Sequence, residues 1–346
     1  MPRFRKHRSL VGILFVIALV EFAGLAVTLA AEGAQRGEIA RLRQELAARA
    51  EEAPPAREEP ADEMAPPPLP AEKPKPAGER SAGEILAGTR LIAHGLGAVD
   101  GENVLNCLEG FARGYARGLR VFEADLRLTA DGQVVLRHDW RAGWQAGVSE
   151  TEIPTREEFL SKPILDQYTP LSFQDLLRLM EAYPDICIVT DTKFTEAETV
   201  RLQFEAMVQD ARALGLSYLL DRLVVQIYDP VMYQVVDGVH HFDHYIFTLY
   251  TIGFSKTEEE FRERAAFCAE NGILGITMPD GWWRGAYAPI AEEYGVKIFL
   301  HTVNDPETAR ILLGGGVTAL YSDTLTPRAI GPERWGIKGG IIHEPY

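Results

Sequence analysis

The sequence predicts an α/β protein whose main domain is a (β/α)8 barrel, and three observations support this prediction. From Arg90 onward, short apolar runs typical of strands alternate with amphipathic runs typical of helices. The alternation extends over roughly 250 residues, the usual size of such a barrel. Polar residues end strand after strand, as expected where catalytic groups gather at the carboxyl ends of barrel strands. A doubly wound open sheet would give a similar alternation, and the polar strand ends favour the barrel.

The expected elements follow one another in regular order. The strand candidates are LIAHG, LRVFEADL, ICIVTDTK, LVVQIY, YIFTLY, LGITMP, VKIFLHTV and ALYSDT. The helix candidates cover residues 104–117, 173–182, 196–214, 231–236, 257–271, 286–294 and 306–313. Residues 140–170 have little periodicity, and we expect them to form an inserted loop region over the mouth of the barrel.

The charge and the cysteine content exclude several classes of protein. A formal net charge of −15 argues against a nucleic-acid-binding protein, which needs a basic face to neutralise phosphates. Cys107, Cys187 and Cys268 lie far apart in apolar runs, at spacings that suit neither a zinc site nor a disulfide framework. We therefore interpret all three as structural thiols.

Residues 1–31 are predicted to form a basic cytoplasmic tail and a transmembrane anchor. An apolar run of ~22 residues starts at Leu10 and is long enough to cross a bilayer as a helix. The basic residues before it should stay cytoplasmic, which gives a single-pass membrane protein with an extracytoplasmic catalytic domain, periplasmic or at the cell surface. A cleaved signal peptide is the alternative, because Ala30 and Ala31 resemble a small-residue cleavage site. The length of the run favours the anchor, and the domain is exported in either case.

Residues 32–80 are predicted to connect this anchor to the barrel. Residues 32–52 have the spacing of a charged helix, and proline, alanine and charged residues dominate from Ala53 to Ala77. Such a composition cannot build a core and is typical of an extended, semi-rigid spacer. The barrel domain is therefore expected to cover residues 81–346.

Three carboxylates at strand ends predict a metal site. Glu123 and Asp125 are separated by one residue of a strand, so both side chains point to the same face. They would repel each other unless a cation lay between them. Asp191 ends another apolar run, and Lys193 follows it on the same face. Such oxygen ligands suit Mg²⁺, Ca²⁺ or Mn²⁺. A solvated strand rim, or a salt bridge to Arg127, is the alternative.

Two histidines accompany these carboxylates. His94 and His138 each end a strand-like run. A single histidine at such a place is more often structural, but two of them near three carboxylates indicate a general acid/base pair.

The stretch from Leu91 to Asp139 resembles the glycerophosphodiester phosphodiesterase family of the phospholipase-C-like barrel superfamily. That family has a His-Arg-Gly strand end, Pro-Glu-Asn, a Glu-x-Asp strand, a Thr-x-Asp-Gly turn and a His-Asp strand. The corresponding segments here are His94-Gly95, Gly101-Glu102-Asn103, Glu123-Ala124-Asp125, Thr129-Ala130-Asp131-Gly132 and His138-Asp139. Later family motifs are matched by Asp191-Thr192-Lys193, His301-Thr302-Val303-Asn304-Asp305 and Ser322-Asp323, so the resemblance covers about residues 90 to 330.

The resemblance implies a role for each matched residue. Glu123, Asp125 and Asp191 would hold a divalent cation, Ca²⁺ or Mg²⁺. His94 and His138 would be the catalytic acid/base pair. The residues expected to bind substrate are Lys193, Glu102, Asn103, Tyr228 and His301, to which Trp283 is added as a residue that could grip a polyol or sugar. Surface packing of Trp283 and a structural His301 are the alternatives.

The chain also departs from the family pattern. Gly95 replaces the arginine expected to bind phosphate, Asp191 is shorter than the usual glutamate, Gly101 replaces a proline and His301 replaces a tryptophan. The predicted function is a metal-dependent phosphodiester hydrolase acting on glycerophosphodiesters or on a glycerol-phosphate-containing envelope component. The alternatives are a barrel that binds without turnover, having lost the arginine, and a phospholipase acting on intact lipids.

Overall fold

The computed structural model describes residues 44, 71–76, 78–141, 143–251 and 253–331. The predicted anchor at residues 1–31 and the charged helix and linker up to residue 70, apart from residue 44, lie outside the described residues. Within the described ranges, no helix combines the length and the apolar character needed to cross a bilayer.

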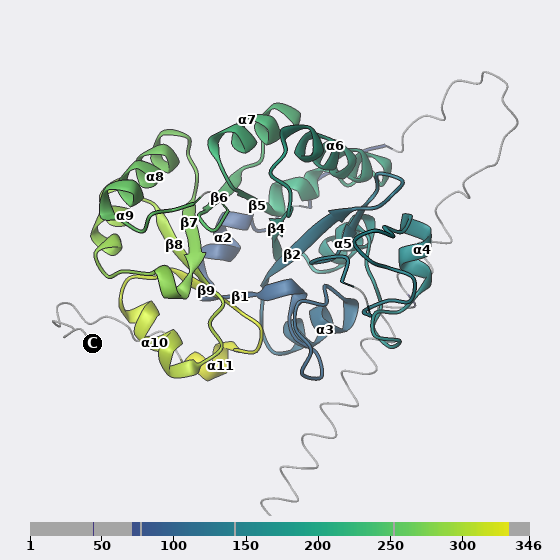
Figure 1. The fold of residues 1–346 in the computed structure, drawn as a ribbon, viewed down its shortest axis with the longest axis horizontal. Helices are drawn as coiled ribbons and strands as arrows, with labels where there is room; N and C mark the ends of the chain where they lie inside the picture. Colours follow the sequence, from purple (N-terminus) through teal and green to yellow (C-terminus); the bar gives the residue numbers. More distant parts are fainter. Residues whose placement is uncertain (1–43, 45–70, 77, 142, 252, 332–346) are drawn as a thin grey trace, which may run out of the picture. The chain divides into compact units, whose positions relative to one another are not determined.

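Eight parallel strands form a closed barrel, which confirms the predicted fold (Figure 1). The strands of the ring are β1 (Leu91–Ala93), β2 (Val121–Leu128), β4 (Cys187–Asp191), β5 (Leu223–Ile227), β6 (His244–Thr248), β7 (Gly275–Pro279), β8 (Lys297–His301) and β9 (Ala319–Ser322). Each strand pairs with the next, and β1 closes the ring by pairing with both β9 and β2. The short strand β3 (Val134–Leu136) pairs antiparallel to β2 outside the ring.

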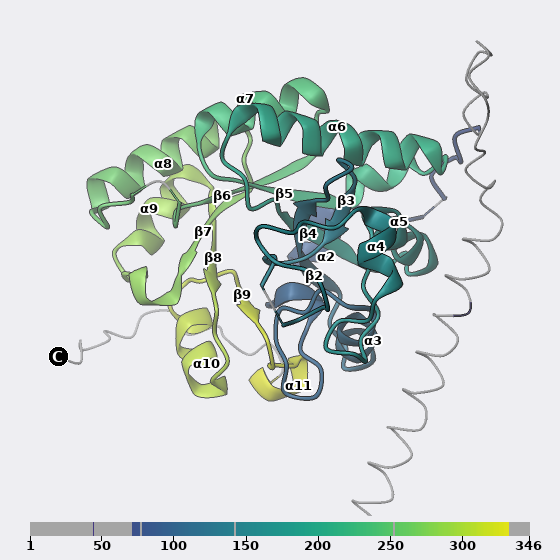
Figure 2. The same cartoon turned by 45° about the vertical axis from the view of Figure 1, so that its right-hand side comes forward.

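Helices surround the strands, as Figure 2 shows from a second direction. The longer ones are α3 (Leu108–Ala116), α5 (Phe173–Ala182), α6 (Ala197–Ala213), α7 (Pro230–Val239), α8 (Glu258–Glu270), α9 (Tyr287–Tyr294) and α10 (Pro306–Gly314), and a short α11 (Pro327–Ile330) follows β9. Their starts follow from local sequence. Ser172 caps α5, and Asp229 and Asp305 cap α7 and α10, each followed by a proline at the first helical position.

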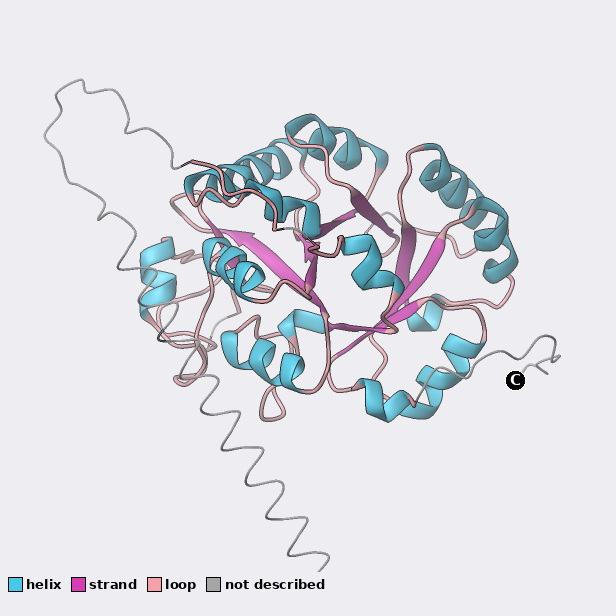
Figure 3. Cartoon of the chain, turned by 180° about the vertical axis from the view of Figure 1, so that it is seen from behind, coloured by secondary structure: helices cyan, strands magenta, loops and turns pink. Residues whose placement is uncertain are grey.

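The short helix α2 (Ala82–Ala87) closes one end of the barrel, as the view from behind in Figure 3 shows. Ser81 and Glu84 form a capping box at its start, and Ala82, Ile85 and Leu86 are buried. They belong to one apolar cluster with side chains from the first residues or the middle of the strands, among them Ile92, Val121, Val189, Val224, Ile246, Phe299 and Ala319. The polar residues that end the strands lie at the opposite end of the barrel, where the strands have their carboxyl ends.

The segment before α2, assigned to the linker, also contacts the barrel. The backbone N–H of Lys73 donates to the carbonyl of Gly215 over 2.8 Å. Glu79 forms an ion pair of 3.0 Å with Arg222, and both side chains are buried. Arg222 also donates to three backbone carbonyls of residues 180–186, so its buried charge is held by these acceptors as well as by Glu79.

The inserted region 140–170 has a small core of its own. Trp140 is buried against Phe159, with their ring centroids 5.9 Å apart, and Val135 and Val148 complete the cluster. Phe159 lies on a short helix, α4 (Arg156–Ser161), in a stretch whose sequence predicted only loop. This apolar contact fixes the region beside β3, next to the His138 strand end.

Candidate active site

The three predicted metal-binding carboxylates lie together inside the barrel. Glu123 and Asp125 point inward from β2, and Asp191 ends β4 directly beside Asp125 in the strand register. One oxygen of each carboxylate lies within 4.8 Å of the other two, and all three residues are buried. The spacing along one strand and the parallel register of its neighbour thus bring the three carboxylates to one place.

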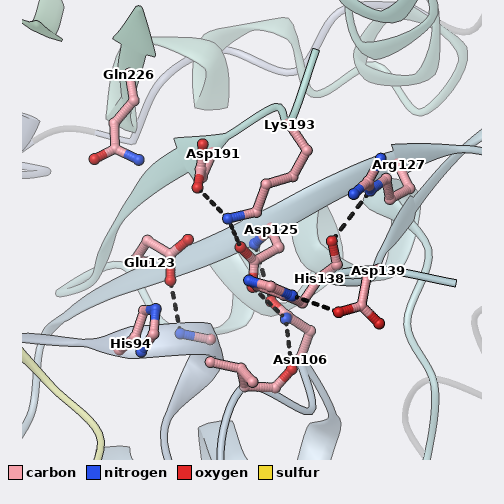
Figure 4. Close-up of polar contacts among 12 residues, drawn as sticks. His94, Asn106, Glu123, Asp125, Arg127, His138, Asp139, Asp191, Lys193 and Gln226 are labelled. Atoms are coloured by element: carbon pink, nitrogen blue, oxygen red, sulfur yellow. Dashed lines mark hydrogen bonds and ion pairs between the residues drawn. The ribbon is translucent and has the colours of Figure 1, made fainter. Parts of the chain in front are cut away.

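Lys193 lies between two of these carboxylates (Figure 4). Its Nζ is 2.7 Å from Asp125 Oδ1 and also contacts Asp191. Burial alone would lower the pKa of Lys193, but the Asp191 and Asp125 charges raise it. The hydroxyls of Tyr228 and Tyr250 donate to Asp191 as well. Lys193 is therefore a fixed positive charge next to the carboxylate cluster.

Glu123 has unused coordinating capacity. Its Oε2 accepts a hydrogen bond of 2.7 Å from the Gly95 N–H, while its Oε1 is buried without a hydrogen-bond partner among the described residues. Burial, together with the Asp125 charge, raises the pKa of Glu123 well above its usual value. Burial alone would also raise the pKa of Asp125, but the charges of Lys193, His138 and His94 lower it. A buried, unpartnered carboxylate oxygen beside two further carboxylates fits a divalent cation.

Asn106 is a site residue that the sequence did not predict. Its amide donates to Asp125 Oδ2 over 2.7 Å, and its Oδ1 accepts from the Asp125 N–H over 2.9 Å. By contrast, Glu102 and Asn103, the predicted substrate-binding residues of this loop, are exposed and do not line the cavity. A bridge between Val99 and Glu102 folds the loop back on itself ahead of the inward-facing Asn106. The one sequence signal for Asn106 is its place just before the helix cap Cys107.

Each candidate catalytic histidine is hydrogen-bonded to a carboxylate through Nδ1. His94 Nδ1 lies 2.8 Å from Asp323 Oδ1. The other carboxylate oxygen of Asp323 accepts a hydrogen bond of 2.7 Å from the side-chain amide of Asn304. His138 lies 3.0 Å from Asp139, which also pairs with Arg141. Burial alone would lower the pKa of His94, but the Asp323 hydrogen bond and the Glu123 and Asp125 charges raise it to about 9. His94 is thus protonated at neutral pH.

A cavity of about 360 Å³ opens over these groups. It is lined by His94, Glu123, His138, Asp191, Lys193, Gln226, Tyr250, Pro279, His301, Thr302 and Tyr321. His301 accordingly reaches the cavity, whereas Tyr228 lies behind Asp191. Trp283 does not line the cavity and packs on Tyr287, with ring centroids 6.1 Å apart.

The backbone around Gly95 accommodates no side chain. Its φ is +54°, and a Cβ there would lie 2.4 Å from Val104 Cα. A phosphate-binding arginine therefore does not fit at this position. The nearby Arg137 does not take its place, because Arg137 is buried, donates to backbone carbonyls and stacks on Trp144. Among the described residues lining the cavity there is no arginine, and Lys193 supplies the fixed positive charge.

Comparisons with known proteins give a fold. No protein-family model and no curated protein sequence match the chain. Among solved structures, a Silicibacter pomeroyi protein provisionally described as a glycerophosphoryl diester phosphodiesterase is similar with a TM-score of 0.59 and 19% identity, covering 72% of this chain and 95% of its own. An Oleispira antarctica phosphodiesterase in complex with the product sn-glycerol-3-phosphate has a TM-score of 0.55 and 16% identity, covering 70% and 96%. A Parabacteroides distasonis glycerophosphodiester phosphodiesterase has a TM-score of 0.54 and 17% identity, covering 68% and 93%. The chain thus has the barrel fold of these phosphodiesterases.

Proposed function

We propose that this protein is a metal-dependent phosphodiester hydrolase acting on glycerophosphodiesters or on a glycerol-phosphate-containing envelope component. One observation carries the proposal: two histidines, each held by a carboxylate, line the same cavity as a buried carboxylate cluster and a lysine. Acid/base groups beside groups that stabilise anionic charge are what cleavage of a phosphodiester requires. The barrel fold shared with solved phosphodiesterases, one of them bound to sn-glycerol-3-phosphate, supports the same reaction class.

Glu123, Asp125 and Asp191 would hold the cation, Ca²⁺ or Mg²⁺. Their oxygens are the donors that such hard cations prefer, and the unpartnered Oε1 of Glu123 supports the assignment. A bound cation would offset the charge that develops on the non-bridging phosphate oxygens. Lys193 would add a second positive charge on the same side of the phosphate. Asn106 orients Asp125 by binding both its side chain and its backbone.

The histidines would divide the proton transfers between them. His94, with a pKa of about 9, holds a proton at neutral pH and suits the general acid that protonates the leaving alkoxide. His138 would act as the general base toward the attacking hydroxyl or water. In both rings Nδ1 is bound to a carboxylate, which leaves Nε2 to exchange the proton with substrate. Asp323 and Asp139 are positioning residues in this scheme.

The two alternative functions receive less support. A phospholipase acting on intact lipids should have an apolar rim near Trp140, Trp144, Trp282 and Trp283. Trp140 is buried, Trp144 is covered by Arg137 and Arg141, and Trp282 and Trp283 pack on Phe254 and Tyr287. A barrel that binds without turnover would explain the glycine in place of the arginine. That reading predicts cation binding without hydrolysis of any diester, so an activity assay separates it from the proposal.

The test is an assay of the purified protein against glycerophosphodiesters and bis-p-nitrophenyl phosphate, with Ca²⁺, Mg²⁺, Mn²⁺ or a chelator. We expect cation-dependent hydrolysis that falls at least ~100-fold in His94→Ala and in His138→Ala. His241→Ala is the matched control, because His241 is exposed and lies outside the cavity, where it pairs with Asp237. Activity that survives the chelator, or both histidine substitutions, would reject this mechanism. Cation binding without any turnover would favour the binding module.

The location and the division into domains are proposed from the sequence. Residues 1–31 would anchor the chain in the membrane, 32–80 would act as linker, and 81–346 would form an extracytoplasmic hydrolase with a small or polymeric substrate and no nucleic-acid partner. Protease added to cells with a permeable envelope should release the domain from the membrane fraction. A domain that stays protected until the membrane is lysed would show the opposite orientation.

A further inference from the structure

A second cavity, of about 260 Å³, lies at the amino-terminal end of the barrel, opposite the candidate active site. It is bounded by α2, the first residue of β1, the loop between α3 and β2, and α11. The buried side chains of Ile85, Leu91 and Ile330 give it an apolar lining. None of the candidate catalytic groups lines it, so the proposed function does not account for this cavity.

Three arginines line this cavity, which we call the arginine pocket after them: Arg80, Arg90 and Arg120. No carboxylate of the described residues lines it. Arg120 is already paired, since its Nε lies 2.7 Å from Asp185 Oδ2. Arg80 and Arg90 are exposed, and each is held by a hydrogen bond to a backbone carbonyl, over 2.7 Å for Arg80 and 3.0 Å for Arg90. Neither of these two forms an ion pair with a carboxylate of the described ranges.

Arg80 and Arg90 are therefore oriented cations with further donors for a ligand. A guanidinium has five N–H groups, and a hydrogen bond to one carbonyl uses only one of them. Glu84, whose charge interacts with that of Arg80, already uses its carboxylate in the capping box with Ser81. Both arginines thus present positive charge that the surrounding side chains leave largely uncompensated.

Positive charge is also concentrated around the arginine pocket, although the whole chain has a formal net charge of −15. Arg117 and Arg328 are the sequence neighbours of two residues of the lining, Gly118 and Pro327, and both arginines are exposed. A cleft lined by one sign of charge raises the local concentration of ions of the opposite sign. The pocket should therefore attract anions, which most of this acidic protein repels.

We propose that the arginine pocket binds the phosphate group of a second ligand, distinct from the substrate of the candidate active site. A carboxylate has two oxygens and is satisfied by one guanidinium, whereas a phosphate has more oxygens and can contact Arg80 and Arg90 together. The volume of the pocket is below the roughly 300–1,000 Å³ of typical small-molecule sites, which suits a phosphate with a short substituent. This inference goes beyond the proposed function and does not depend on it.

Two sources can supply such a phosphate: a dissolved anion and the headgroup of an anionic phospholipid. The position of the pocket makes the lipid a source to be tested. Arg80 directly follows Glu79, whose ion pair with Arg222 fixes the place where the chain joins the barrel. The pocket therefore lies at the end of the barrel through which the proposed membrane anchor is connected.

The first measurement is a calorimetric titration of the full chain with inorganic phosphate, in neutral detergent and with a chelator present. We expect saturable binding that weakens at least about fivefold in Arg80→Gln and in Arg90→Gln, because each variant loses charge-assisted hydrogen bonds. Arg262→Gln is the matched control, since it removes the same charge from an exposed arginine on α8, outside the pocket. Lys193→Met should also leave this binding unchanged, because Lys193 lines the other cavity.

The second measurement identifies the source of the phosphate. The full chain is placed in bilayer discs of phosphatidylcholine, with and without phosphatidylglycerol, and amide hydrogen exchange of residues 84–91 is followed. Exchange that phosphatidylglycerol slows, and that the combined Arg80→Gln and Arg90→Gln substitutions restore, identifies a lipid headgroup. Binding of inorganic phosphate without such a difference in exchange identifies a dissolved anion.

The inference is overturned if the chain shows neither saturable phosphate binding nor slower exchange with phosphatidylglycerol. It is also overturned if these effects survive both arginine substitutions, or if they disappear in Lys193→Met, which would place the phosphate in the candidate active site. Diester hydrolysis, assayed in parallel, should be retained in the arginine variants, because Arg80 and Arg90 lie at the end of the barrel opposite that site. The failure of either proposal is thus visible independently of the other.

Discussion

Replacing Asp323 by asparagine tests the proposed acid directly. The substitution keeps the size of the side chain and an oxygen that can contact His94, but it removes the negative charge 2.8 Å from His94 Nδ1. Asp323 provides the largest of the interactions that raise the pKa of His94 from 6.5 to about 9 against the opposing effect of burial. Glu123 and Asp125 also raise it and remain in the variant. We therefore expect the pKa of His94 to fall by about one to two pH units.

The consequence for catalysis has a definite sign. Because His94 must carry a proton to act as the acid, kcat/KM should decline at alkaline pH in the wild type and at lower pH in Asp323→Asn. A bound cation would offset the Glu123 and Asp125 charges equally in both proteins, so the comparison depends on Asp323. Between pH 6 and pH 8, kcat/KM of Asp323→Asn should fall by about 2- to 10-fold more than that of the wild type. The pH dependence of the free energy of unfolding provides a second test of the His94 pKa. A raised pKa stabilises the fold fully below pH 6.5 and loses this effect as pH rises through about 9.

The measurements are the pH dependence of kcat/KM and of the free energy of unfolding between pH 5 and 10. At pH 6 the variant should be less stable by about 1.4 kcal/mol for each pH unit by which the pKa of His94 falls, and this difference should diminish toward pH 9 and above. Asp305→Asn is the matched control, because Asp305 caps α10 outside the cavity and asparagine caps helices equally well. An alkaline limb that stays at the same pH in Asp323→Asn would refute the assignment of His94 as the acid oriented by Asp323.

Three further predictions follow from buried contacts. Gly95→Ala should lower the free energy of unfolding by at least ~2 kcal/mol in chemical denaturation, because its Cβ would collide with backbone, whereas Gly281→Ala has open space. Lys193→Met should raise the affinity for Ca²⁺, measured by titration, by about tenfold or more, because the competing ammonium is removed; weaker binding would contradict this. Arg222→Met should cost about 3–5 kcal/mol by leaving Glu79 buried without its partner, and Glu79→Gln in the same chain should recover part of this loss.

The alternation of apolar runs was enough to predict the barrel. Runs such as ICIVT and LVVQIY are mostly apolar because both faces of a parallel barrel strand are covered, and the observed β4 and β5 coincide with them to within one residue. Helices with strong caps, such as α5 and α10, were predicted to within about one residue. The short β3 lies within the strand-like run that ends at His138. The closing helix α2 was not predicted, since six residues hold too little pattern and its burial depends on contacts distant in the chain.

The site residues on strands could be predicted from the sequence, whereas those on loops could not. The inward direction of Glu123 and Asp125 follows from the two-residue period of a strand, and their proximity to Asp191 follows from parallel register. Loop residues follow no such period. The loop that carries Glu102 contains non-glycine residues with positive φ, Val104 and Asn106 among them, and this conformation decides that Asn106 points inward. The motif resemblance therefore located a loop that contributes to the site, but Glu102 and Asn103 do not line the cavity, and the residue of this loop that contacts the carboxylate cluster is Asn106, through Asp125.

The position of α2 also bears on which substrates can reach the site. Residues 71–76 and α2 contact the amino-terminal end of the barrel, while the cavity lies at the carboxyl ends of the strands. The last stretch of the linker thus joins the barrel at the end opposite the cavity, and Glu79 fixes this point of entry through its ion pair with Arg222. If the preceding residues anchor the chain as proposed, the cavity need not face the membrane that holds it. This arrangement fits a soluble or polymeric phosphodiester better than a lipid still embedded in that membrane.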